Sequence, residues 1–410
     1  MRIKKIEIRN YRSCNHTVFE PNESLSALIG PNGSGKTNIL SAIKLISSLT
    51  TMRRRRLIRD HGLQSPCEIK TWYDLDGNNV IHTAKIHLVT NERNQDEILG
   101  SEESWYMHSI TGSKKRIKIP FEILVDIIHE REYFYHTDSH IRGRFFGNIF
   151  GEKDISEKAI SSIARIIEYV GGITYYSASQ FTNPSNCPIS FEVEGDEKKR
   201  RGISITGHKR FLYEMYQEYI NNTDSYKEYF EIVGPSGIGL VENIEFKEIE
   251  TSSSNYSVMA GGRVTKREKV NLLVIPGFQI SGSNLSPSQL SEGTFKTLAL
   301  TFYLITDKST LLMIEEPEVC VHHGLLQSIV ELIKLYAQEK QIFISTHSDS
   351  VLDSLDMSSI YRVVKDANKG TTITSLARSI KGQELEALKY YLENEGSLGE
   401  FWKHGDLESE

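Results

Sequence analysis

Short apolar runs, each followed by a polar or glycine-rich segment, recur along the chain. Leu25–Ile29, Leu311–Ile314 and Gln341–Ser345 are strand-length and mainly apolar, which is typical of strands buried on both faces. Apolar residues recur at helical spacing within 39–49 and again within 325–333. Because the last two runs flank the second helix, they predict a βαβ unit and an α/β fold with a mixed, partly parallel sheet.

The segments between these runs predict a β-rich N-terminal part and two insertions. Residues 2–10 and 67–90 have the alternation of strands, with a turn at 76–79. A polar loop is expected at 91–104. The other expected elements are helices at 121–135, 155–170 and 211–230, strands at 173–177 and within 238–280, and a loop-rich boundary at 182–210. The tyrosines of 211–230 are expected to pack against their neighbours.

These elements predict one large domain with insertions. We expect a lobe at 1–94 and 171–190, a helical insertion at 95–170, a mixed helical and β insertion at 191–270, a second lobe at 271–380 and a helical tail at 381–410.

Gly30–Thr37 fits the phosphate-binding pattern G-x-x-x-x-G-K-[ST] between an expected strand and an expected helix. Glycines let the backbone turn its N–H groups toward phosphates, and the start of the helix adds positive potential. Lys36 is expected on the β- and γ-phosphates and the Thr37 hydroxyl on Mg²⁺. The expected nucleotide-binding residues here are Gly30, Asn32, Gly33, Ser34, Gly35, Lys36, Thr37 and Asn38.

Carboxylates follow the apolar run at 311–314, in the arrangement of a Walker B motif. We assign Glu315 to Mg²⁺ and Glu316 to the orientation or deprotonation of the attacking water. His347 follows the next buried run, at the strand ends where open α/β sheets bind ligands, and there it can donate a hydrogen bond to the γ-phosphate. Lys36, Glu316 and His347 are therefore the expected catalytic residues.

A second anion site is expected at Leu290–Thr294, which precedes an apolar helix. Ser291 and Gly293 at a helix start can bind an anion. The presence of two anion-binding sites in one chain is explained if the second binds the nucleotide held by another subunit.

Composition places the chain among ordinary globular proteins, with 39% hydrophobic and 25% charged residues and a net charge of −6. Four widely spaced cysteines and the lack of a long apolar stretch favour a cytoplasmic location without a membrane partner. Any nucleic-acid contact must come from local basic patches. Arg53–Arg56 is one candidate, and it is equally explained as a solvated surface or a dock for an acidic partner.

Taken in order, GPNGSGKT, LSEGT, IEEPE and STHS resemble the ATP-binding-cassette heads of the SMC/RecF/OLD superfamily. The resemblance covers roughly residues 1–50, 171–190 and 275–365. It implies an ABC-type ATPase head that uses ATP and Mg²⁺. LSEGT rather than a transporter LSGGQ argues against a transporter, and Glu315 in place of the more common Asp favours the OLD-like branch.

The resemblance also implies that two heads sandwich two ATP molecules, so that the chain forms an ATP-dependent dimer or higher homo-oligomer. Ser291 and Gly293 would face the partner's nucleotide, and His347 would be the switch histidine. Arg12, within Asn10–Ser13, resembles an arginine that reaches the nucleotide in these heads. Gln180 is our candidate for the glutamine that senses Mg²⁺, with Gln64 as its rival.

OLD proteins resembling this chain carry a C-terminal Toprim nuclease, whereas only 63 residues without a D-x-D motif follow His347. Stand-alone ATPases of this branch resemble subunits of anti-phage systems such as Septu and PARIS. We therefore expect a nuclease or toxin effector supplied in trans. Two alternatives remain: a RecF-like repair ATPase on duplex DNA, and a nucleotide-locked scaffold that sequesters an effector.

Overall fold

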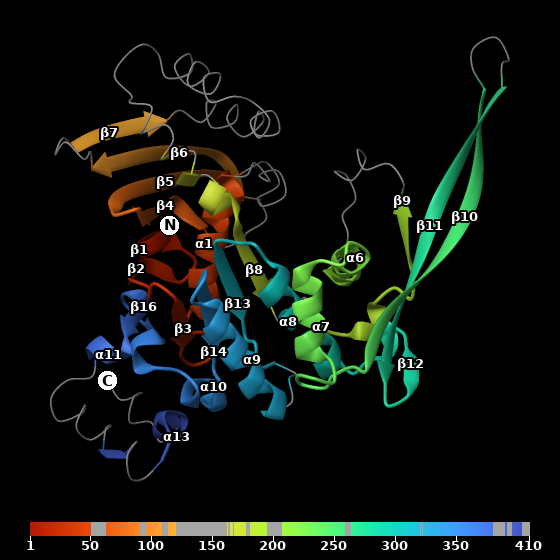
Figure 1. Cartoon of the computed structure of the whole chain (residues 1–410). Helices are drawn as coiled ribbons and strands as arrows, with labels where there is room; N and C mark the ends of the chain where they lie inside the picture. The colour runs from red at the N-terminus through yellow and green to blue at the C-terminus, as the bar shows by residue number, and fades with distance from the viewer. Residues whose placement is uncertain are drawn as a thin grey trace. The chain divides into compact units, whose positions relative to one another are not determined.

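The chain forms two compact units, which are described separately (Figure 1). The computed structural model describes residues 1–50, 63–90, 96–108, 114–119, 162–177 without 163, 164 and 167, 181–194, 207–258, 264–379 without 320 and 322, 390–391 and 396–403. Unit 1 comprises 1–176, 308–316 and 334–410, and unit 2 comprises 177–307 and 317–333. The predicted helix at 121–135, Arg53–Arg56 and Gln180 lie outside the described residues.

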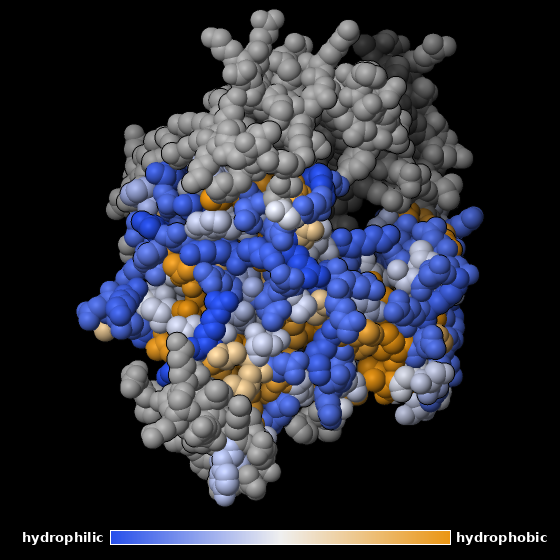
Figure 2. Space-filling view, turned by 60° about the vertical axis from the view of Figure 1, so that its left-hand side comes forward, coloured by the Kyte–Doolittle hydropathy of each residue, from blue (hydrophilic) through white to orange (hydrophobic). Residues whose placement is uncertain are grey.

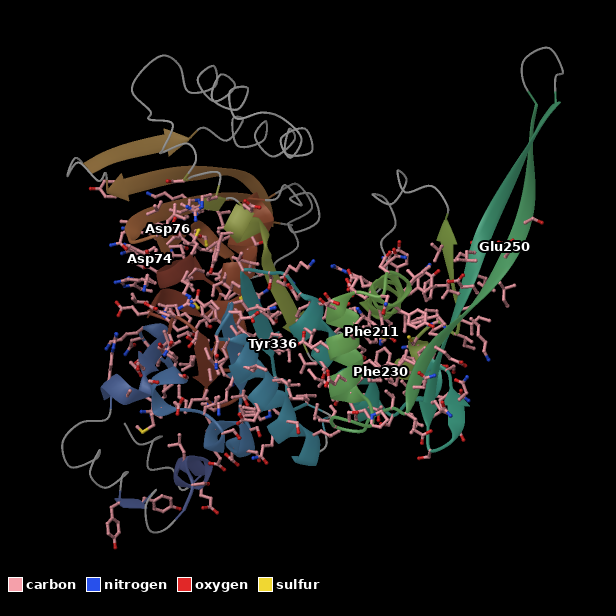
Figure 3. All side chains as sticks on the ribbon, in the orientation of Figure 1. Asp74, Asp76, Phe211, Phe230, Glu250 and Tyr336 are labelled. Atoms are coloured by element: carbon pink, nitrogen blue, oxygen red, sulfur yellow. The ribbon has the colours of Figure 1, made fainter. Side chains whose placement is uncertain are left out.

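An antiparallel sheet of six strands forms from the N-terminal part of unit 1. Its strands, in spatial order, are β2 (Cys14–Phe19), β1 (Arg2–Tyr11), β4 (Leu63–Leu75), β5 (Asn78–Thr90), β6 (Asp96–His108) and β7 (Lys114–Ile119). The turn predicted between β4 and β5 is confirmed: Asp76, labelled in Figure 3 beside Asp74, has a φ of 52°, and Gly77 N donates to Asp74 Oδ1 at 2.9 Å.

The predicted loop at 91–104 is wrong from Asp96 onward, because β6 pairs with β5 from Asp96 to Met107 and with β7 from Glu103 to His108. Residues 96–108 and 114–119 are thus β structure, where a helical insertion was expected. The segment is mainly polar and lacks a clear alternation. Backbone hydrogen bonds to β5 are independent of side chains, so a polar strand can extend the sheet without the pattern that sequence analysis detects.

The second sheet of unit 1 is mixed and carries the predicted motifs. Its order is β16 (Gly370–Ser375), β15 (Ile360–Asp366), β3 (Leu25–Ile29), β14 (Gln341–Thr346), β13 (Leu311–Glu315) and β8 (Ile173–Ser177). The β15–β3, β3–β14 and β14–β13 pairs are parallel, and β15–β16 is antiparallel. The predicted βαβ unit is confirmed as β13, α9 (His323–Tyr336) and β14.

Helix α1 (Lys36–Thr50) shares one hydrophobic core with both sheets of unit 1. Ile39, Ile43 and Ile46 lie on its apolar face, and all three are buried. The core continues through Ile6 of β1 and Phe343 of β14. Because α1 begins directly at the phosphate loop, this packing fixes the loop. The short helices of the C-terminal part are η6 (Met357–Ser359), α10 (Asp349–Asp353), α11 (Leu376–Ser379) and α13 (Leu398–Lys403).

Gln341 joins the two sheets through its buried side chain. Its Oε1 accepts from Ile3 N at 2.9 Å and from Tyr169 OH at 3.2 Å. Its Nε2 donates to Ile3 O at 3.0 Å and to Asn22 O at 2.8 Å. The side-chain amide of Gln341, the first residue of β14, therefore hydrogen-bonds to both the N–H and the C=O of Ile3 in β1.

Unit 2 contains helices and a separate antiparallel sheet. The sheet pairs β10 (Asn243–Val258), β11 (Val264–Ile280) and β12 (Ser283–Leu285) in that order, with β9 (Phe191–Glu194) also on β11. Its described helical elements are η3 (Pro184–Asn186), α6 (Gly207–Ile220), α7 (Asp224–Val233), η5 (Pro287–Gln289), α8 (Glu292–Thr306) and residues 323–333 of α9.

The single helix predicted at 211–230 is instead α6 and α7. Asn222 adopts a left-handed conformation with a φ of 47°, and the Thr223 hydroxyl then caps α7 by accepting from Tyr226 N. Aromatic residues of these helices pack on α8 and β10. For example, Phe211 (Figure 3) lies 5.5 Å from Phe295, and Tyr219 lies 5.0 Å from Phe246, between ring centroids.

Within the described residues, no helix is long and apolar enough to cross a membrane. The face in Figure 2 is mainly hydrophilic where the structure is described, with smaller hydrophobic areas between.

We predict that Gln341→Leu lowers the free energy of unfolding by about 3 kcal/mol, because it leaves buried backbone groups of β1 without partners. Urea denaturation followed by circular dichroism measures the change. Gln338→Leu, at an exposed position beyond α9, is the matched control and should cost little. Equal effects of the two variants would contradict the role assigned to Gln341.

Candidate functional site

The phosphate loop connects β3 to α1, as the motif requires. Gly33 and Gly35 have φ values of 81° and 106°, which L side chains rarely adopt. A Cβ on Gly30 would lie 2.2 Å from Val363 O, so β15 packs directly against the start of the loop. A Cβ on Gly35 would lie 2.1 Å from Thr371 Oγ1. The neighbouring strands therefore require glycine at two of the motif's positions.

Lys36 is folded into the loop rather than extended into solvent. It is 6% exposed, and its ammonium donates to Gly30 O at 2.6 Å and Pro31 O at 3.2 Å. The Ser34 hydroxyl is also buried, and no hydrogen-bond partner for it exists in the described structure. A buried cation, a hydroxyl without a partner and glycines with positive φ together form a cradle that fits an anion such as a polyphosphate.

The carboxylate of Glu315 lies directly beside the loop. One oxygen, Oε1, accepts a hydrogen bond from Thr37 Oγ1, and the other, Oε2, accepts one from Tyr175 OH. Hydroxyl and carboxylate oxygens are the ligands that Mg²⁺ prefers in nucleotide sites. The structure thus brings together Thr37 and Glu315, both expected to bind the metal.

Glu316 and His347 are neighbours at the ends of adjacent strands. His347 Nδ1 lies 3.6 Å from Glu316 Oε1, and both side chains are partly exposed. Glu316 has a φ of 49°, and its N–H donates to Ser345 O at 2.8 Å. A left-handed glutamate costs energy, and such strain is frequently found at functional sites. This turn takes Glu316 out of the β13 ladder directly after Glu315.

Arg12 and Asn38 belong to a hydrogen-bonded chain that reaches the loop from the β1–β2 turn. Arg12 Nη1 donates to Asn38 Oδ1 at 3.3 Å, and Asn38 Nδ2 donates to Ser13 Oγ at 2.6 Å. Ser13 Oγ lies 2.7 Å from Thr371 Oγ1. Thr371 Oγ1 in turn donates to Ser34 O at 3.0 Å. The chain connects the expected nucleotide-contacting arginine to the backbone of the loop.

Ser291 and Gly293 lie in unit 2, at the start of α8. Ser291 is the N-cap residue, and its hydroxyl accepts from Thr294 N at 3.1 Å. Thr297 Oγ1 donates to Gly293 O at 2.8 Å. The predicted helix start is confirmed. The role of these residues toward a second subunit's nucleotide stays a prediction.

Other predicted contacts are not described. Gln180 and Arg53–Arg56 lie outside the described residues, and Gln64 is described only as part of β4.

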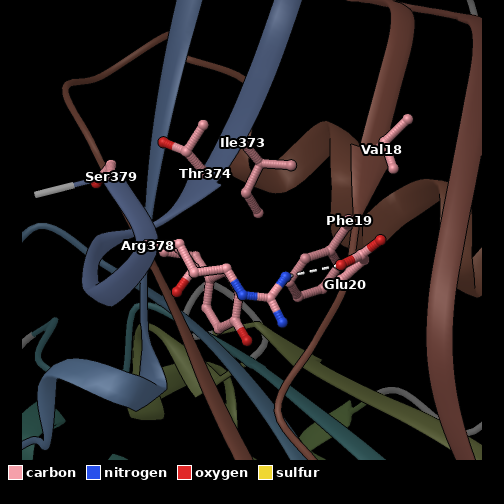
Figure 4. A pocket seen from close by; sticks show the side chains of 9 residues that line it. Val18, Phe19, Glu20, Ile373, Thr374, Arg378 and Ser379 are labelled. Carbon is pink, nitrogen blue, oxygen red and sulfur yellow. Dashed lines mark hydrogen bonds and ion pairs between the residues drawn. The ribbon is translucent and has the colours of Figure 1, made fainter. Parts of the chain in front are cut away.

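A cavity of about 240 Å³ lies elsewhere in unit 1, where β2, β15, β16 and α11 meet (Figure 4). Phe19 and Tyr361 line it, and the Arg378–Glu20 ion pair, at 2.7 Å, crosses it. None of the motif residues lines this cavity, so it is separate from the candidate site.

Residues 25–353, which include the loop, both glutamates and His347, match the family model described as "AAA domain, putative AbiEii toxin, Type IV TA system". The chain belongs to this AAA family. A relative over most of the chain is the Old nuclease of Escherichia phage P2, 21% identical over 95% of the chain and 62% of the nuclease. The chain therefore spans less than two thirds of that relative.

Local similarity to DNA-repair proteins accompanies this match. RecF of Prosthecochloris aestuarii is 51% identical over 43 residues, which are 10% of the chain and 12% of RecF. The solved structure of an SmcHead bound to the C-winged helix domain of ScpA is 15% identical, covers 95% of the chain and all of the SmcHead, and has a TM-score of 0.49. The chain is thus similar to Old nuclease and, locally, to RecF, and the family shown by the matching model is the AAA family.

Sequence reasoning missed Tyr175 and Thr371, and it gave Ser13 no role although Ser13 lies within the Asn10–Ser13 motif. Tyr175 lay in a predicted strand, but nothing in the sequence showed that this strand is the neighbour of β13. Thr371 lies beyond every motif, and no local pattern marks it.

We predict that Gly35→Ala destabilises the protein by at least about 2 kcal/mol more than Gly33→Ala does. Both alanines are strained by positive φ, but the Gly35 Cβ also meets Thr371 and Ser13, whereas nothing lies within 4 Å of the Gly33 Cβ. Urea unfolding without nucleotide measures the difference, and equal values would show that Thr371 does not pack on the loop.

Proposed function

We propose that this chain is a Mg²⁺-dependent ATPase whose heads assemble around ATP and regulate a nuclease or toxin effector supplied by a second polypeptide, in defence against phage. The observation that carries the proposal is the convergence of Lys36, Thr37, Glu315, Glu316 and His347 at the ends of three adjacent strands. In this proposal, each supplies chemistry that ATP hydrolysis needs.

The residues of unit 1 have distinct tasks in this proposal. The loop N–H groups and Lys36 bind the β- and γ-phosphates and orient the terminal phosphorus. Thr37 and Glu315 hold Mg²⁺, which neutralises charge that develops on the phosphate oxygens. Glu316 accepts a proton from the attacking water, and His347, 3.6 Å from that carboxylate, donates to the terminal phosphate.

Two features favour assembly. Ser291 caps the N-terminal end of α8, and Gly293 adds no side chain of its own to the first turn. Such helix ends bind anions, and each head supplies one in addition to its own phosphate loop. We infer that the second helix end completes the nucleotide site of another copy, so hydrolysis is slow in isolated chains.

The similarity to Old nuclease over 95% of the chain favours the OLD-like branch. The local RecF similarity favours the alternative of a repair ATPase that binds duplex DNA, although it covers only 10% of the chain. ATP-dependent duplex binding with a steep salt dependence separates the two.

We predict that Lys36→Ala abolishes ATP binding, because it removes the buried ammonium of the loop. Titration with a fluorescent ATP analogue measures affinity, with Lys365→Ala, at an exposed position of β15, as the control. Retained affinity would overturn the nucleotide assignment.

We predict that Glu316→Gln retains ATP binding, loses hydrolysis and accumulates an ATP-dependent oligomer. The amide cannot accept the water's proton, so the closed assembly persists. Phosphate release and mass photometry, with and without ATP–Mg²⁺, measure the two effects, and Glu339→Gln on an exposed position is the control. Wild-type turnover in Glu316→Gln would refute its assigned role. An oligomer that forms equally without ATP would favour the scaffold alternative.

A further inference from the structure

Strand β8 brings an unassigned tyrosine to the expected metal ligand. β8 is the neighbour of β13 in the mixed sheet (Figure 1), and Tyr175 OH donates to Glu315 Oε2. Glu315 Oε1 accepts from Thr37 Oγ1. Both oxygens of one carboxylate are therefore held, by hydroxyls from two different elements, and its plane is fixed.

Helix α1 constrains the tyrosine itself. Lys44 Nζ lies 4.5 Å from the centroid of the Tyr175 ring, within the range of a cation–π interaction. Lys44 is seven residues from Thr37, so two helical turns separate them and they share one face of α1. The same helix face thus contacts the carboxylate through Thr37 and the aromatic ring through Lys44.

The two hydrogen bonds to its carboxylate restrain the Glu315 side chain, which is longer than an aspartate. A glutamate has one more rotatable bond than the aspartate found in many related heads, so ordering its carboxylate costs more conformational entropy. A second hydroxyl restrains the added freedom before any metal binds. Groups that orient a ligand in this way commonly change metal affinity 10- to 100-fold when they are removed.

We propose that Tyr175 is a positioning residue that holds the Glu315 carboxylate for Mg²⁺, with Lys44 holding the tyrosine ring. The inference rests on the proposed function, because it assumes that Thr37 and Glu315 form the metal site. It adds β8 and the outer face of α1 to that site, and it assigns them to metal affinity rather than to nucleotide affinity.

The test separates Mg²⁺ binding from nucleotide binding. In Tyr175→Phe, binding of a fluorescent ATP analogue is titrated first in EDTA and then, at fixed nucleotide, against Mg²⁺. We expect the affinity for the nucleotide in EDTA to be unchanged. The Mg²⁺ concentration that gives half of the Mg²⁺-dependent change in nucleotide binding should be roughly 10-fold higher than in the wild type. The matched control is Tyr176→Phe, since the next residue of a strand points to the opposite face; it should match the wild type in both titrations.

A second variant keeps the inference falsifiable if Tyr175→Phe folds poorly. Lys44→Met keeps the side-chain length and removes the charge over the ring, and we expect a shift in Mg²⁺ dependence of about 3-fold in the same direction.

Wild-type Mg²⁺ dependence in Tyr175→Phe would overturn the inference and leave the proposed function standing. An equal loss of affinity in EDTA would also overturn it, because it would indicate general packing. If the wild type bound no ATP, the proposed function would itself fail, and this inference with it.

Discussion

The parallel hydrogen-bonded ladder of β3, β14 and β13 is the constraint on which the candidate site depends. Ile29 pairs with Thr346, and Ser345 pairs with Glu315. Parallel strands end at the same edge of a sheet, so this register places the start of the loop, His347 and the two glutamates level with one another. A shift of one residue in either pairing would separate groups that must meet within a few ångströms. The buried apolar residues of these strands therefore affect function because they fix the register of the sheet.

The motifs and their strands could be predicted because each has a strong local signal. Apolar runs marked β3, β13 and β14, and the charged or glycine-rich residues after them marked the strand ends. β6 could not be predicted, because its polar residues carry no alternation and its stability comes from backbone pairing with β5 and β7. The break between α6 and α7 had a signal in Asn222 and Thr223, which favour a left-handed turn and a helix cap, but the aromatic periodicity across it suggested one helix.

Contacts across long sequence separations were beyond sequence reasoning. Thr371 donates to Ser34 O from a strand 337 residues away, and Tyr175 reaches Glu315 from 140 residues away. Neither residue belongs to a motif, and their types are common in strands. Their importance comes from strand order, since β16, which carries Thr371, pairs with β15 beside β3, and β8, which carries Tyr175, lies beside β13. Single-sequence patterns give strand existence far better than strand order, so the supporting residues of the site appear only in the structure.

These supporting contacts distribute the site over the whole of unit 1. The loop is bounded by Val363 on one side and Thr371 on another, and Gln341 connects the motif-bearing sheet to β1 through a buried amide. A rigid loop is useful to an enzyme that stabilises charge, because donors already in place need no reorganisation when phosphate charge develops. Glu316, in contrast to the rigid loop, has a strained left-handed backbone. The hydrogen bond from its N–H to Ser345 O holds it in this conformation. Since Ser345 lies in β14 and His347 directly follows that strand, any movement of this strand end alters the proposed base and its neighbouring histidine together. Under the proposed function, coupling between assembly and hydrolysis would therefore act through the Glu316 turn, while the loop and Glu315 stay fixed.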